Sequence, residues 1–66
     1  METVTYIVPG MHCEHCRATV TEEVSRVEGV ESVDVDLETK LAVVTGEQLE
    51  DARLRAAIDE AGYEAV

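Results

Sequence analysis

The sequence predicts an α+β fold of the ferredoxin-like type: a βαββαβ sandwich with two helices on one face of a four-stranded antiparallel sheet. Its 66 residues suffice for one small hydrophobic core. The apolar residues alternate in some stretches and recur at helical spacing in others. In order, these stretches match two interleaved right-handed βαβ crossovers. We therefore expect residues 1–66 to form a single domain.

The first stretch predicts a strand followed by a helix. Residues 3–8 alternate, as in a half-buried strand, and the apolar face consists of Val4, Tyr6 and Val8. A Pro-Gly pair then ends the strand. A helix begins at about residue 14, and its apolar stripe comprises Cys16, Val20, Val24 and Val27. We expect Gly29 to end this helix in the left-handed conformation.

Residues 30–37 predict the second strand, because Val33, Val35 and Leu37 alternate with two aspartates. A turn at residues 38–40 leads into a returning strand over residues 41–45, so the two strands form a hairpin.

A second helix is predicted over residues 50–61. Its apolar residues recur at helical spacing and comprise Leu54, Ala57, Ile58 and Ala61. Acidic residues in the first turn suit the positive end of the helix dipole. Gly62 is expected to stop this helix, and residues 63–66 are expected to form the fourth strand.

The composition argues against two classes of partner. Fifteen acidic residues against five basic ones give a net charge of −10. Binding to nucleic acid or to an anionic membrane needs a positive patch, so neither is expected. The acidic residues are interpreted as a solvated face, with steering toward a basic partner as the alternative. This set includes Glu22, Glu23, Glu31, Asp34 and Asp36.

The sequence also predicts a cytoplasmic location. No apolar run reaches the roughly 18 residues of a membrane span. The first ten residues lack the basic region and the apolar stretch of a secretory signal. In a reducing compartment, two cysteines are expected to serve as metal ligands or redox thiols rather than as a structural disulfide.

The segment GMHCEHC, residues 10–16, carries the chemistry. We expect Cys13 in a loop and Cys16 in the first turn of the helix. Residues three apart on a helix have Cβ atoms about 5–6 Å apart, which lets both sulfurs reach one metal ion. The helix N-terminus also stabilises thiolate, the form that binds metal.

Two soft thiolates favour Cu(I), whereas Zn(II) usually takes four ligands. His12 and His15 could complete such a set in principle. Each is adjacent to a cysteine, however, so four converging ligands would be strained. Both histidines are interpreted as exposed; for His15 the alternative is a position beside the metal, or a ligand role in a metal-bridged homodimer.

The GMHCEHC segment, at the start of a helix in a βαββαβ chain, resembles the heavy-metal-associated domain family. The chain is similar in size to bacterial copper chaperones of the CopZ type. The resemblance covers nearly the whole chain and includes three further segments: Gly29-Val30, Val33-Asp-Val-Asp-Leu37 and Ala61-Gly-Tyr63.

The resemblance implies Cu(I) bound by Cys13 and Cys16. It implies that Met11 packs beneath the loop as a hydrophobic tether and that Tyr63 lies on the facing loop beside the metal. It also implies transfer of copper to the metal-binding domain of a copper-transporting P-type ATPase. A copper-responsive regulator and a second, copper-bridged copy of the chain are further possible partners.

Several alternatives stay open at this point. The same scaffold could carry zinc or mercury, although zinc-handling relatives tend to have Asp where this chain has His12. The cysteine pair could serve a thiol–disulfide oxidoreductase, although we expect a binding protein without substrate turnover. The chain could also be a domain of an ATPase. Arg17 is interpreted as offsetting the charge of a bis-thiolate site, as contacting a partner, or as a plain exposed residue.

Overall fold

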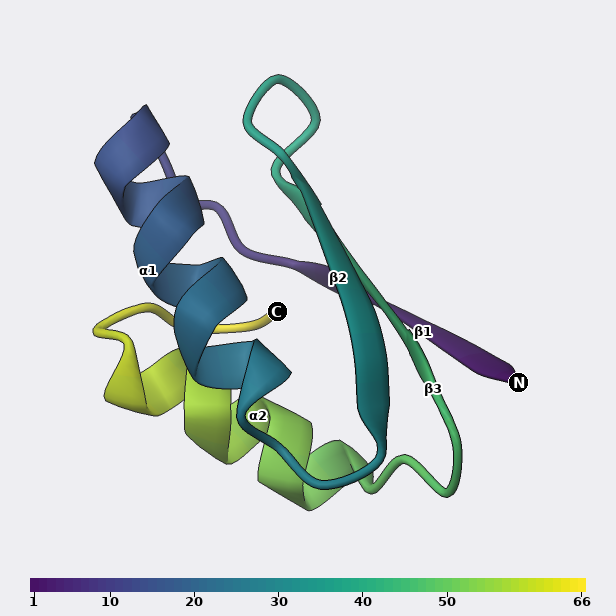
Figure 1. Cartoon of the computed structure of the whole chain (residues 1–66). Coiled ribbons are helices and arrows are strands. Elements are labelled where there is room, and N and C mark those ends of the chain that lie inside the picture. The colour runs from purple at the N-terminus through teal and green to yellow at the C-terminus, as the bar shows by residue number, and fades with distance from the viewer.

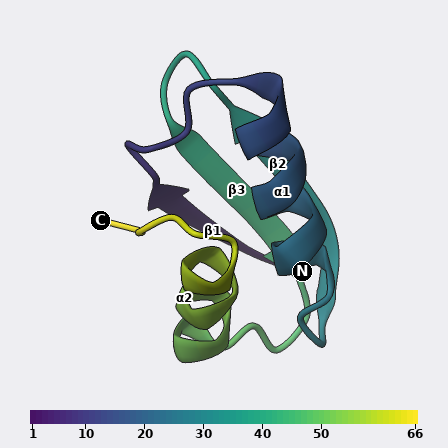
Figure 2. The ribbon, with the colours of Figure 1, turned by 90° about the vertical axis from the view of Figure 1, so that its left-hand side faces the viewer.

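The computed structural model describes all residues from 1 to 66 and contains a sheet packed against two helices. In chain order the elements are β1 (Glu2–Ile7), α1 (Glu14–Ser25), β2 (Val30–Asp36), β3 (Leu41–Gly46) and α2 (Asp51–Glu60). The strands are antiparallel and lie in the order β1-β3-β2. Both helices lie on one face of the sheet (Figures 1 and 2).

The alternation predicted for the strands sets which face meets the helices. Tyr6, Ala42 and Val35 share one cross-strand row, and all three are buried. The neighbouring row points to the other face, where Ile7 is 47% exposed and Asp36 is exposed. One face of the sheet is therefore covered and the other meets water, as is usual for an antiparallel sheet.

The core lies between the sheet and the helices and is built almost wholly from aliphatic side chains. Tyr6 is its only aromatic member: the chain has neither Phe nor Trp, and the second tyrosine, Tyr63, is partly buried and packs against the core. Both predicted helical stripes contribute to it, and the buried residues are Tyr6, Val8, Met11, Val20, Val24, Val35, Ala42, Val44, Leu54 and Ile58. Each Val, Leu, Ile or Met side chain of this core contributes about 1.5–3 kcal/mol on full burial.

The prediction of a fourth strand is wrong: the sheet has three strands. Residues 63–66 do run beside β1, where a fourth strand would lie (Figure 2). They make one backbone hydrogen bond to it, from the Val66 amide to the Ile7 carbonyl at 2.7 Å. The Ala65 carbonyl accepts from the Arg55 guanidinium at 3.4 Å. A single backbone bond does not make a ladder, so this segment follows the sheet edge without joining it.

The first helix ends earlier than predicted. It closes at Ser25, and the Arg26 and Val27 amides donate three residues back, to Glu23 and Val24. Gly29 does have a positive φ of 92°, but it serves the turn into β2. A Cβ there would collide with the Glu47 carbonyl oxygen. Neither helix has the length and apolarity needed to cross a membrane.

Candidate metal centre

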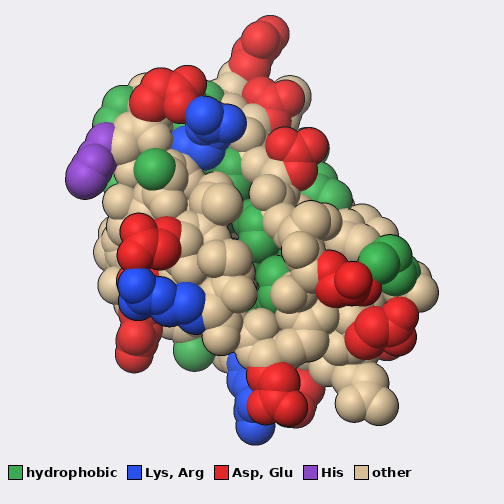
Figure 3. Space-filling model, in the orientation of Figure 1, with side chains coloured by type: hydrophobic (Ala, Val, Ile, Leu, Met, Phe, Trp, Pro, Cys, Tyr) green, Lys and Arg blue, Asp and Glu red, His purple; other side chains and the backbone are tan.

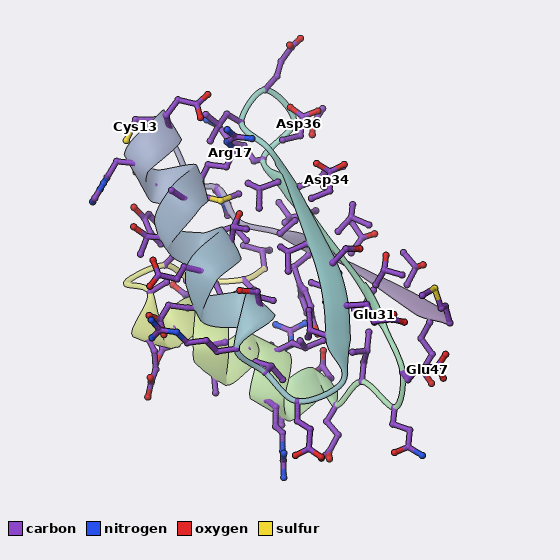
Figure 4. All side chains as sticks on the ribbon, in the orientation of Figure 1. Cys13, Arg17, Glu31, Asp34, Asp36 and Glu47 are labelled. Carbon is purple, nitrogen blue, oxygen red and sulfur yellow. The ribbon has the colours of Figure 1, made fainter.

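The two cysteines lie at the N-terminus of α1, at an outer corner of the molecule (Figure 4). Cys13 is the N-cap residue, with an extended backbone at φ −147°. Its sulfur accepts from the Cys16 amide at 3.4 Å. A cysteine thus fills a position that Ser, Thr, Asp or Asn usually occupies. The free amides and the positive end of the helix dipole favour negative charge here.

The sulfurs of Cys13 and Cys16 are 3.0 Å apart, and both cysteines are free. A metal held by both sulfurs at about 2.3 Å each would separate them to roughly 4–5 Å. Cys13 is exposed, whereas Cys16 is half-buried. The exposed side chain of Cys13 therefore has the freedom to swing outward and open the pair for a metal ion.

The pKa of Cys16 is lowered from an ordinary 9.0 to about 6, first by a hydrogen bond from the Cys13 thiol. The Tyr63 hydroxyl and the His12 backbone amide donate to the same sulfur and lower the pKa further. Conversely, the Cys16 sulfur raises the pKa of Tyr63 to about 12. Donors converging on one sulfur stabilise its thiolate, so Cys16 is charged near neutral pH.

The end of α2 brings Tyr63 to this sulfur. Gly62 has φ 94°, and its amide donates to the Asp59 carbonyl at 2.9 Å. The next amide, that of Tyr63, donates to the Ile58 carbonyl at 3.1 Å. These two bonds form a Schellman motif, which reverses the chain after the helix. The ring of Tyr63 then lies against Gly10, where an added Cβ would be 3.3 Å from the ring.

The structure places the remaining predicted site residues as follows. Met11 is fully buried as a member of the hydrophobic core. His12 and His15 are exposed, and the His15 carbonyl accepts from the Thr19 hydroxyl. No cluster of three or more His, Cys, Asp or Glu side chains could hold a metal ion. Of the side chains predicted to lie at the site, the two cysteine sulfurs are brought together, 3.0 Å apart.

Arg17 does not reach the sulfurs. Its guanidinium pairs with Glu14 at 2.6 Å, and its side chain extends toward the β2–β3 hairpin (Figure 4). Both partners are largely exposed, so this pair contributes little to stability. The charge of a bis-thiolate site is thus not offset by direct contact with Arg17.

Sequence reasoning missed Lys40, whose ammonium donates to the Met11 carbonyl at 2.5 Å. Lys40 lies in the turn between β2 and β3, distant in sequence from the cysteines. A turn lysine carries no local signal for such a contact. Only the packing of the hairpin against the β1–α1 loop brings the two together.

Acidic side chains are spread over the face seen in Figure 3 rather than gathered in one patch. Several of them are paired along the helices, including Glu22 and Glu23 with Arg26. This distribution fits a solvated face.

Comparison with known proteins identifies the family. The model described as "Heavy-metal-associated domain" matches residues 5–64. A mercuric transport protein periplasmic component from Pseudomonas aeruginosa is 47% identical over 64 residues, covering 94% of this chain and 70% of that protein.

Solved structures of similar fold include a metallochaperone and a copper binding domain of a P-type ATPase. The CopZ metallochaperone has a TM-score of 0.93 at 30% identity, covering 98% of this chain and 100% of that one. A copper binding domain from HMA7, a P-type ATPase, has a TM-score of 0.92 at 28% identity, covering 100% of this chain and 92% of that one.

Proposed function

Because this chain belongs to the heavy-metal-associated domain family, we propose that it is a Cu(I) chaperone that binds the ion through Cys13 and Cys16. The observation that carries this proposal is the sulfur pair at the N-terminus of α1, with Cys16 poised as a thiolate. Soft thiolates select soft ions such as Cu(I), and the absence of a clustered third ligand disfavours tetrahedral Zn(II).

Transfer follows from the incomplete coordination that two ligands leave. A thiolate from a partner attacks the bound ion before the first sulfur departs, so the ion is never released to water. Cys13 is the more exposed sulfur and the point of first exchange, whereas Cys16 retains its bond within the hydrogen bonds from Tyr63 and the loop. No substrate is turned over in this cycle.

The receiving protein in this proposal is the metal-binding domain of a copper-transporting P-type ATPase. The support is the likeness to the HMA7 domain, since two domains of one fold can present similar sulfur pairs to each other. A copper-responsive regulator is a further recipient. We place the exchange in the cytoplasm, where thiols stay reduced.

A mercury carrier is the second candidate, and a specific observation favours it. The mercuric transport protein named above is 47% identical, against 30% for CopZ. Hg(II) is also a soft ion for which a thiolate pair is suitable. The two candidates share the same site and differ only in the cargo.

An anaerobic competition titration distinguishes the candidates. Wild-type protein is titrated with Cu(I), Hg(II) and Zn(II), each against a chelator of matched strength. The copper proposal expects Cu(I) to bind at one ion per chain and more tightly than Zn(II). Hg(II) binds tightly to any pair of thiolates, so its affinity does not show whether it is the cargo. That question is decided by measuring transfer of Hg(II) and of Cu(I) to the recipient domain. Transfer of Hg(II) but not of Cu(I) would replace the copper proposal with the mercury one.

Two double variants identify the ligands. We expect C13S/C16S to lose Cu(I) uptake and H12A/H15A to retain it, because the sulfurs alone form the site. The histidine variant is the matched control, since it changes exposed residues of the same segment. A disulfide reductase assay on the wild type, with negligible turnover expected, tests the oxidoreductase alternative.

A further inference from the structure

Lys40 is the only lysine of the chain and lies in a turn with a defined shape. The Asp36 carboxylate accepts from the Glu38 amide at 2.8 Å and from the Thr39 amide at 3.3 Å, which fixes the start of the turn. Lys40 then adopts the left-handed conformation, with φ 64°. The side chain of Lys40 leaves the hairpin toward the loop between β1 and α1, which lies at the same end of the molecule (Figure 2).

Lys40 holds this loop at both ends. Its backbone carbonyl accepts from the Val8 amide at 2.8 Å, just after β1. Its ammonium donates to the Met11 carbonyl at 2.5 Å and lies 3.5 Å from Nδ1 of His12. A hydrogen bond from a charged donor is stronger than one between neutral groups. The backbone between Val8 and His12 is therefore restrained from the hairpin.

The Met11 carbonyl and the His12 amide belong to one peptide group. This peptide is trans, because the chain contains no cis bond, so its carbonyl and its N–H point in opposite directions. The ammonium of Lys40 lies on the carbonyl side. The His12 N–H therefore points away from the ammonium.

We propose that Lys40 is a positioning residue of the metal site, which holds the Met11–His12 peptide and thereby fixes the backbone that leads directly into Cys13. The ammonium touches neither the sulfurs nor the ion and acts through this one peptide. Through Lys40, the β2–β3 hairpin thereby contributes to metal affinity. This inference rests on the proposed soft-metal function of the cysteine pair.

Three variants test the inference in Cu(I) competition titrations. Lys40→Met keeps the aliphatic stem but removes the donor. We expect it to weaken Cu(I) binding about tenfold, because losing a residue that supports a metal ligand usually weakens metal binding by about 10- to 100-fold. Lys40→Arg restores a cationic donor and should recover most of that loss. Arg53→Met is the matched control, because it removes one positive charge from an exposed residue whose nearest acid, Glu50, is 3.7 Å away.

A structural readout separates positioning from general destabilisation. The amide resonance of His12 should shift in Lys40→Met and return toward its wild-type position in Lys40→Arg, while the Arg53→Met spectrum stays unchanged there. Lys40→Gln, which also lacks the charge, provides a second variant in case Lys40→Met folds poorly.

The outcomes distinguish the inference from its premise. A wild-type protein that bound no Cu(I) or Hg(II) would remove the proposed function. If the wild type binds, an affinity of Lys40→Met and Lys40→Gln within twofold of the wild type would overturn the role of Lys40 alone. Equal losses in Lys40→Met and Arg53→Met would also overturn it, because net charge rather than the held peptide would then set the affinity.

Discussion

The two helices begin in similar ways but leave their N-termini in different states. In α1, the Tyr63 hydroxyl donates to the sulfur of Cys16. In α2, the Tyr6 hydroxyl donates to the carboxylate of Asp51 at 2.6 Å. Both tyrosines have their pKa raised to about 12, Tyr6 chiefly through burial and Tyr63 chiefly through its hydrogen bond to the sulfur. Each helix thus starts with an anion held by a tyrosine from a distant segment.

The difference lies in what else surrounds each anion. Nε of Arg55 donates to Asp51 at 3.0 Å, and the same guanidinium lies 5.2 Å from the centroid of the Tyr6 ring. The Tyr6 hydrogen bond, followed by contact with Arg55, lowers the pKa of Asp51. No cation makes such a contact with the sulfurs, since Arg17 pairs with Glu14 and Lys40 bonds to backbone. The anion of α2 has a cationic partner in Arg55, whereas the anion of α1 has none, as the proposed metal site requires.

The largest expected effect comes from removing each anion in turn. Cys16→Ser should weaken Cu(I) binding by more than about a hundredfold, because it removes a proposed ligand. Losing a residue that only supports a ligand usually costs less than this. Asp51→Asn should leave the affinity within twofold, because that carboxylate is remote from the sulfurs. Competition titration of both variants measures this contrast. Comparable losses in the two variants would break the distinction between the helix ends.

A smaller effect separates the two tyrosines. Tyr6→Phe should lower the free energy of unfolding by about 1–2 kcal/mol, since it removes the hydroxyl and with it the hydrogen bond to the charged Asp51. The same substitution should not alter metal affinity. Urea denaturation of the apo-protein measures the first quantity and a Cu(I) titration the second. An unchanged urea midpoint would show that the Tyr6–Asp51 bond does not stabilise the fold.

The smallest effect concerns the pH dependence of the α1 end. Alkylation of Cys16 by iodoacetamide should have its midpoint near pH 6, and Tyr63→Phe should move that midpoint upward by removing one donor. In the folded protein the pKa of Cys16 lies below its ordinary value of 9.0. The Cys16 thiolate therefore stabilises the folded state fully above pH 9, and this stabilisation is lost as the pH falls through about 6. Mass spectrometry of the labelled peptide follows the reaction. A midpoint equal in both proteins would contradict the role given to Tyr63.

Much of the fold followed from periodicity. The alternation of β1, β2 and β3 and the apolar stripes of both helices place most of the core residues correctly, and the family prediction is confirmed by the match over residues 5–64. The last segment misled because strand formation depends on partners in space. Its Val66 amide reaches β1, but the Ala65 carbonyl is taken by Arg55, which no local pattern reveals.

The same distinction between local and long-range features applies to the candidate metal site. The spacing of Cys13 and Cys16 is local, so the helix start could be predicted with its sulfurs close together. The contacts of Lys40 with the loop and of Asp51 with Tyr6 join segments far apart in the chain. Sequence periodicity does not encode such pairings. The role of Tyr63 beside the metal was implied by the family resemblance alone and stays a prediction until metal is bound.

The claim that the sulfur pair of α1 is the metal site is tested most directly by X-ray absorption on anaerobic, copper-loaded protein with a measured copper-to-chain ratio. The account predicts one copper per chain with two sulfur neighbours and no nitrogen or oxygen ligand. A ratio of one copper to two chains, with additional sulfur neighbours, would indicate the copper-bridged homodimer. A first shell containing imidazole or carboxylate ligands would contradict the account.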